Sequence, residues 1–111
     1  MAHKLYQVTF RWVKTPAKSA ELEPSFASLG DWARLNAYSW FVLTQHTSSQ
    51  VYETLRSQIS AEDNIIIIAT NPSDYYGWAP PWFWNWLAQK QTQLKPPLPF
   101  PFSFPPTPGQ R

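Results

Sequence analysis

The chain has 111 residues, a formal net charge of +2 and no cysteine. This length suits one domain with a single modest core. The absence of cysteine excludes a disulfide framework, thiolate catalysis and a cysteine-based metal site. A charge of +2 is too small to indicate a nucleic-acid-binding protein by itself. Aromatic residues form 17% of the chain and charged residues 14%, so bulky rings must supply much of the buried area.

Targeting signals and membrane spans are not apparent in the sequence. The N-terminus, MAHKLYQVTF, lacks the apolar centre of a signal peptide. No run approaches the roughly 18 apolar residues that a membrane-spanning helix needs. We therefore expect a soluble, cytoplasmic protein with no membrane partner.

The first elements show two different periods. Residues 4–13 alternate, with Tyr6, Val8 and Phe10 on one side, which predicts a half-buried strand. A polar loop follows. The next apolar residues recur at helical spacing, and a proline suits their first turn while a glycine suits the stop. The residues that indicate this amphipathic helix are Leu22, Pro24, Phe26, Leu29 and Gly30.

The middle of the chain predicts two strands, a helix and a further strand. Residues 31–36 alternate weakly, and residues 38–45 are rich in aromatic and β-branched side chains, as in a hairpin. Ser48 or Ser49 can cap a helix whose Val51, Leu55 and Ile59 form one stripe. Residues 64–70, NIIIIAT, form an apolar run, which predicts a strand covered on both faces. The order is βαββαβ, so we expect an α+β, ferredoxin-like domain.

Tryptophan dominates the segment that follows, GWAPPWFWNWL at residues 77–87. Pro80 and Pro81 can begin a short helix with a wide apolar face. Trp82 and Trp86 share this face, with Phe83 and Leu87 beside them, while Trp84 points elsewhere. This aromatic helix is expected to cover the core or to form a dimer seam. A surface that binds a partner or ligand is the alternative reading for Trp82, Trp84 and Trp86.

Proline changes the character of the chain near its end. We place a folded domain at residues 1–91 and a proline-rich tail at 92–111, which must be extended or polyproline II. Phe100, Phe102 and Phe104 make this tail more apolar than an ordinary linker. It is either a disordered end or a segment that docks on a partner.

Several short strings together resemble one family. They are LYQVTF near the start, SLGDW at 28–32, SWFV at 39–42, VYETLRSQI at 51–59, IIII at 65–68, Gly77-Trp78 and Trp86-Leu87. Over residues 4–88 the chain resembles the small CRISPR-associated protein two superfamily, especially its SinR-like branch. The resemblance implies a ferredoxin-like protomer that forms a homodimer through its sheets.

Members of that superfamily differ in activity. Some are metal-dependent nucleases that use an aspartate at the end of the first strand, and others are non-catalytic scaffolds that hold duplex DNA. At the corresponding place this chain has Arg11, whose guanidinium offers only hydrogen-bond donors. A hard divalent cation needs oxygen ligands. We therefore expect no catalytic residues, no metal site and no cofactor.

The sequence thus favours a non-catalytic, homodimeric binding or scaffold module that engages nucleic acid or a larger protein assembly. Arg11, Lys14 and Lys18 are its candidate phosphate contacts, and a solvated loop is the alternative for them. A divergent metal-dependent endonuclease, an RNase or DNase, is the second hypothesis. Its acids would come from elsewhere, such as Asp31 or Asp63.

Overall fold

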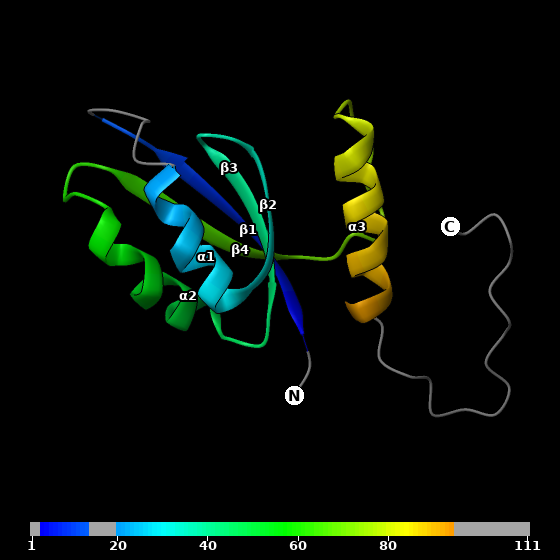
Figure 1. Cartoon of the computed structure of the whole chain (residues 1–111), viewed down its shortest axis with the longest axis horizontal. Helices are drawn as coiled ribbons and strands as arrows, with labels where there is room; N and C mark the ends of the chain where they lie inside the picture. The colour runs from blue at the N-terminus through cyan, green and yellow to red at the C-terminus, as the bar shows by residue number, and fades with distance from the viewer. Residues whose placement is uncertain (1–2, 14–19, 95–111) are drawn as a thin grey trace, which may run out of the picture.

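The computed structural model describes residues 3–13 and 20–94, which form an α+β fold (Figure 1). A four-stranded antiparallel sheet is combined with three α-helices and a short 3-10 helix. The elements follow in the order β1 (Lys4–Arg11), α1 (Glu23–Leu29), β2 (Gly30–Asn36), β3 (Ser39–Thr44), α2 (Ser48–Leu55), η2 (Arg56–Gln58), β4 (Asn64–Thr70) and α3 (Pro81–Leu94).

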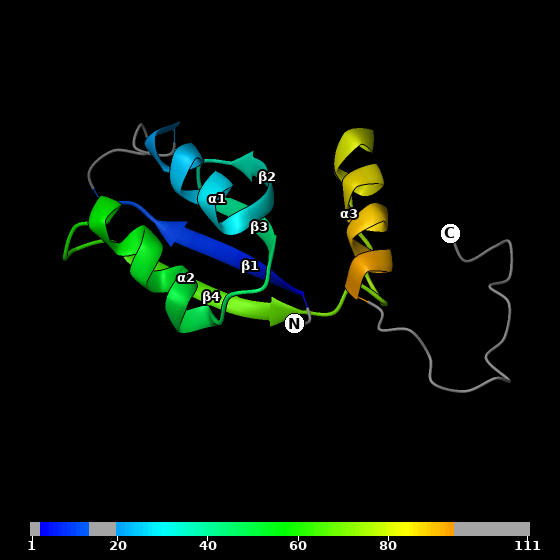
Figure 2. The same cartoon turned by 60° about the horizontal axis from the view of Figure 1, so that its bottom comes forward.

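The sheet separates the helices into two layers. Its strands lie in the order β2-β3-β1-β4, and every neighbouring pair is antiparallel. Helices α1 and α2 lie on one face, while α3 lies on the opposite face (Figures 1 and 2). This arrangement is compatible with a ferredoxin-like fold to which a third helix has been added.

The first core lies between the sheet and helices α1 and α2. The alternation of β1 places Tyr6, Val8 and Phe10 on this face, as the sequence predicts. Trp40 on β3 stacks on Phe26 of α1, with ring centroids 4.2 Å apart and planes 5° apart. The other buried members of this cluster are Leu22, Leu29, Val42, Val51 and Leu55.

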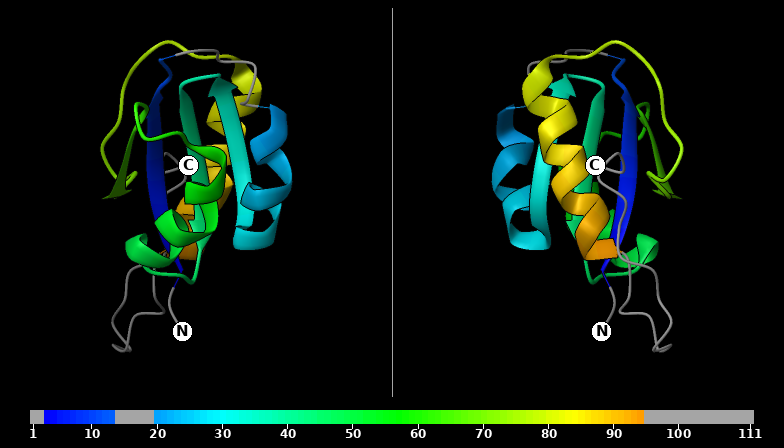
Figure 3. Two further views of the ribbon diagram at one scale, coloured as in Figure 1. Left: turned by 90° about the vertical axis from the view of Figure 1, so that its left-hand side faces the viewer. Right: turned by 90° about the vertical axis from the view of Figure 1, so that its right-hand side faces the viewer.

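The second core lies on the opposite face, beneath α3. Leu5, Ala33 and Leu43 of the sheet pack against Phe83 and Leu87 of the helix. Helix α3 is longer than the short helix that the sequence predicts, and it crosses β1 and β2 (Figure 3). The prediction that this aromatic segment covers a core is confirmed.

Within the single chain, strand β4 is covered on one face only. Its apolar run predicts cover on both faces, by the aromatic helix, by a partner's sheet or by both, and α3 does not supply it, because Ile66 and Ile68 are 55% and 57% exposed. Ile65 and Ile67 pack against the first core. The physical reason is position, because β4 is at the end of the strand order and α3 packs on β1 and β2 instead.

The helix ends follow local sequence signals. Gly30 ends α1 and begins β2 without a loop, and Thr44 Oγ1 donates to the carbonyl of Leu29 at this junction, at 2.7 Å. Helix α2 begins one residue earlier than expected. Its cap is Thr47, which forms a reciprocal capping box with Gln50.

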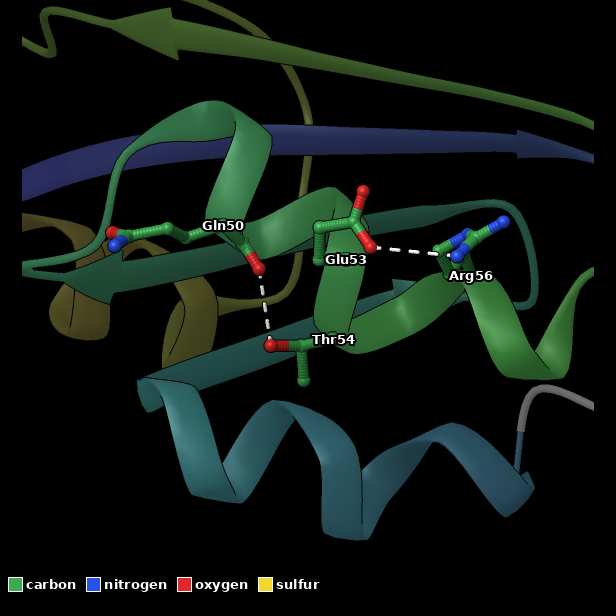
Figure 4. A network of polar contacts seen from close by, with 4 residues as sticks. All are labelled: Gln50, Glu53, Thr54 and Arg56. Atoms are coloured by element: carbon green, nitrogen blue, oxygen red, sulfur yellow. Dashed lines mark hydrogen bonds and ion pairs between the residues drawn. The ribbon is translucent and has the colours of Figure 1, made fainter.

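Figure 4 shows polar contacts along α2 and at the start of η2, each between residues three or four positions apart. Thr54 Oγ1 donates to the carbonyl of Gln50 at 3.0 Å, and Arg56 pairs with Glu53 at 3.5 Å. An exposed pair of this kind contributes little to stability. Among the described residues, no helix combines the length and apolarity that a membrane span requires.

Candidate interaction surface

The predicted phosphate-binding edge is described at only one of its three residues. Arg11 is exposed at the end of β1, and its Nη1 donates to Oδ1 of Asn64 on β4, at 3.3 Å. Lys14 and Lys18 lie outside the described residues. Of the three predicted phosphate contacts, the described residues therefore include only Arg11, which is an exposed cation.

Asp31 belongs to a polar cluster that fixes α3 to the sheet. Its Oδ2 forms an ion pair with Nζ of Lys90, and its Oδ1 accepts a hydrogen bond from the indole of Trp86, at 3.2 Å. The Lys90 ammonium also lies 5.6 Å from the centre of the Trp86 ring. Because Lys90 is buried, its ammonium is not an exposed charge on α3.

Asp63 organises the turn before β4. Its Oδ2 accepts hydrogen bonds from both the backbone N–H and the hydroxyl of Ser60, and its Oδ1 accepts one from the backbone N–H of Val13, at 2.9 Å. Both candidate acids thus have structural partners. Within residues 3–13 and 20–94, no three His, Asp or Glu side chains are grouped as a metal site would require.

An exposed aromatic surface lies where the segment after β4 meets the beginning of α3. We call Tyr75, Tyr76, Trp78, Trp82 and Trp84 the aromatic surface. Tyr76 and Trp78 are fully exposed, and Trp82 is about half exposed. Tyr75 stacks on Trp84, with ring centroids 5.5 Å apart and planes 9° apart. This stacking gives part of the surface a fixed shape.

The buried face of α3 agrees with the expectation in part. The predicted wide apolar face contains Trp82 and Trp86 with Phe83 and Leu87 beside them, and the buried residues are Phe83 and Leu87 together with Lys90. Trp82 therefore faces solvent, whereas Trp86 is partly buried against the second core. The cause is that Phe83 stands over Phe41 of β3, with ring centroids 5.1 Å apart, and this contact sets the rotation of the helix.

Two hollows lie at the aromatic surface, and one of them reaches the sheet. One, of ≈ 730 Å³, is lined by Gly77, Trp78, Ala79, Pro80, Pro81, Trp84 and Asn85. A second, of ≈ 270 Å³, reaches from Tyr75 and Tyr76 down to Gln7 of β1. Gln7 is the cross-strand partner of Ile68, so Ile68 lies beside one of the residues that line this hollow.

Some surface residues were missed by the sequence reasoning. Tyr75 and Tyr76 follow a polar turn and carry no periodic signal, although two adjacent tyrosines beside Gly77 could have been noted. Ile66 and Ile68 were predicted to be covered by the aromatic helix or by a partner's sheet, and the helix does not cover them. Phe100, Phe102 and Phe104, the predicted partner contacts of the tail, lie outside the described residues.

Comparisons of the chain with protein-family models, with curated proteins and with solved structures found no match in any of the three.

Proposed function

We propose that the protein is a non-catalytic, homodimeric binding module with a ferredoxin-like fold, related to the SinR-like branch of the CRISPR-associated protein two superfamily. The observation that carries the proposal is exposed apolar area on one side of the molecule. Ile66 and Ile68 of β4 are more than half exposed, and Tyr76 and Trp78 of the aromatic surface are fully exposed. Exposed apolar surface of this kind marks interaction sites.

A protein surface fits this region better than a nucleic acid does. Single-stranded nucleic acid requires cations beside the stacking rings. Among the described residues, Lys90 is the basic residue on α3, and it is buried in its pair with Asp31. Arg11 lies at the other end of β1 from Leu5, which α3 covers, and is a separate candidate phosphate contact.

A second copy of the chain is the partner that we propose for the exposed isoleucines. Two such faces of β4, packed together, would bury Ile66 and Ile68 of both copies. The double variant Ile66→Lys/Ile68→Lys places positive charges from both copies in that contact, where they repel each other. Sedimentation equilibrium at tens of micromolar should show a dimer for the natural chain and a monomer for the variant.

The matched control is Tyr52→Lys, which adds a charge at an exposed aromatic residue of α2, on the opposite side of the sheet. It should leave the dimer intact. A natural chain that sediments as a monomer, or a dimer that survives both lysines, would refute the proposed interface.

Nucleic acid remains the second proposed partner, through Arg11, Lys14 and Lys18. Replacing all three with Ala should weaken duplex binding similarly for all sequences, and each lost phosphate contact should reduce the log–log salt slope by roughly one. Hydrolysis of RNA or DNA with magnesium or manganese should not exceed a mock preparation. Activity that disappears in Asp31→Asn or Asp63→Asn would establish the endonuclease alternative instead.

A further inference from the structure

The outer edge of β4 presents backbone groups that no described strand pairs with. In the part of the chain that the structure describes, β4 ends the strand order and has β1 as its one neighbour (Figure 3). An open edge is a template for an added strand. Which residues of β4 offer their N–H and C=O groups follows from the register.

The hydrogen bonds of β1 determine which way the backbone N–H and C=O groups of β4 point. The N–H of Phe10 donates to the carbonyl of Tyr38, at 2.8 Å, so Phe10 directs its backbone groups toward β3. Backbone groups alternate along a strand, so Gln7 and Thr9 direct theirs toward β4. Their partners Ile68 and Ile66 therefore point back to β1. The residues that point outward are Ile65, Ile67 and Ala69.

The two ends of the sheet differ in polarity. The edge strand β2 carries Asp31 and Arg34, and Arg34 forms an ion pair with Glu23 at 3.2 Å. Charged side chains on an edge strand discourage pairing with another strand. Strand β4 has apolar residues at all positions from Ile65 to Ala69. Its edge is thus the one suited to an apolar strand.

Residues 98–105 of the same chain have the composition of such a strand. Their sequence is LPFPFSFP, in which Leu98, Phe100, Phe102 and Phe104 alternate with Pro99, Pro101, Ser103 and Pro105. In an extended chain, alternate residues direct their backbone groups to opposite edges. All three prolines therefore fall on one edge, and the other edge keeps every N–H. Proline is found in edge strands in this arrangement, with its position facing solvent.

The described chain ends close to one end of β4. Leu94 and Gln91 of α3 line a hollow of ≈ 470 Å³ together with Ala69 and Thr70, at the end of β4. An antiparallel partner of β4 must begin at that end. Three residues, 95–97, separate Leu94 from Leu98, and each extended residue spans roughly 3.3 Å. The segment of eight residues also matches the seven of β4.

We propose that residues 98–105 add to the outer edge of β4 in the same chain, as a fifth, antiparallel strand. The residues that keep their N–H groups, Leu98, Phe100, Phe102 and Phe104, pair with the outward-pointing residues of β4. Opposed residues share a face, so the phenylalanines extend the first core beside Ile65 and Ile67. The prolines lie beside Ile66 and Ile68. The tether keeps the effective concentration of the segment high.

Amide hydrogen exchange of the full chain, followed by NMR, tests this pairing. In the natural protein the amides of Ile65, Ile67 and Ala69 should exchange slowly, as is expected for Ile66 and Ile68, whose amides are hydrogen-bonded to β1. Phe102→Pro removes an N–H from the pairing edge and should increase the exchange rates of the Ile65, Ile67 and Ala69 amides by about tenfold or more. Ser103→Pro is the matched control, because it places the same ring on the solvent edge and should preserve slow exchange.

Several results would overturn the proposal. They are rapid exchange of Ile65, Ile67 and Ala69 in the natural chain, protection that Phe102→Pro leaves unchanged, and protection that both proline variants abolish. Mixing labelled Phe102→Pro with excess unlabelled natural chain tests for exchange of tails between copies. Protection restored in that mixture would replace the single-chain strand with one from a second copy. The added strand does not require the proposed homodimer, and sedimentation of the same samples reports on that separately.

Discussion

Replacing Asp31 by Asn should destabilise the protein more than replacing its partner Lys90 by Met. The two charges differ in exposure, because the Lys90 side chain is 7% exposed and that of Asp31 is 50% exposed. Asp31→Asn keeps an oxygen for the Trp86 indole but leaves the buried ammonium without a counter-charge. Lys90→Met keeps the apolar stem and leaves a carboxylate that water can reach.

The expected magnitudes follow from that asymmetry. Removing one partner of a fully buried ion pair costs about 3–5 kcal/mol, and the half-exposed carboxylate reduces this, so we expect about 2 kcal/mol for Asp31→Asn. Lys90→Met should cost less than about 1 kcal/mol, since it loses the contact of the ammonium with the Trp86 ring and retains the packing.

Urea unfolding provides the assay, with the free energy of unfolding and its slope measured for each variant. The double variant Asp31→Asn with Lys90→Met should return close to the stability of Lys90→Met alone, because it contains no unpaired buried charge. Equal costs for the two single variants, or a larger cost for Lys90→Met, would show that burial does not control this pair.

Two further predictions concern the first core and the junction before β2. A Cβ at Gly30 would lie 2.1 Å from the carbonyl oxygen of Leu43, so Gly30→Ala must separate β2 from β3 and should cost about 2–3 kcal/mol in urea unfolding; a cost near zero would contradict this contact. Burial raises the pKa of Tyr6 above 10.0, and folding therefore favours its protonated form. The contribution of the protonated Tyr6 side chain to the free energy of unfolding should be complete below pH 10.0 and decrease as the pH rises further. Tyr6→Phe should therefore lose less stability than the natural chain when the pH becomes alkaline. At neutral pH the same variant should lose about 1 kcal/mol with the hydrogen bond to His46, and identical alkaline curves would refute the assignment.

The elements that repeat a clear period were predictable from the sequence. The alternation of Tyr6, Val8 and Phe10 identified β1, and the apolar run identified β4 with the same bounds as the structure. Helical spacing of Val51 and Leu55 identified α2. In each case the spacing of the apolar residues shows which side chains face the core, and this spacing differs between a strand and a helix.

The exposure and pairing of side chains that depend on how one element packs on another could not be predicted from the period of the sequence. The exposure of Ile66 and Ile68 depends on where α3 crosses the sheet, and no pattern within β4 contains that information. The sequence places Phe83 and Leu87 on the apolar face of α3, but it could not show that Trp82 is exposed, since this depends on the contact of Phe83 with Phe41 on a distant strand. Asp31 and Lys90 are far apart in sequence, so their pair is visible only in three dimensions.

The central place of β1 has a consequence for how the chain acquires its structure. β1 comes first in the sequence, yet its neighbours are β3 and β4, and the contact of Thr70 with Leu5 spans 65 positions. During synthesis β1 has no strand to pair with until β3 has emerged, and the sheet is incomplete until residue 70 is available. Long-range pairing of this kind slows folding. We therefore expect a slow-folding chain whose apolar β1 is exposed to aggregation while synthesis proceeds.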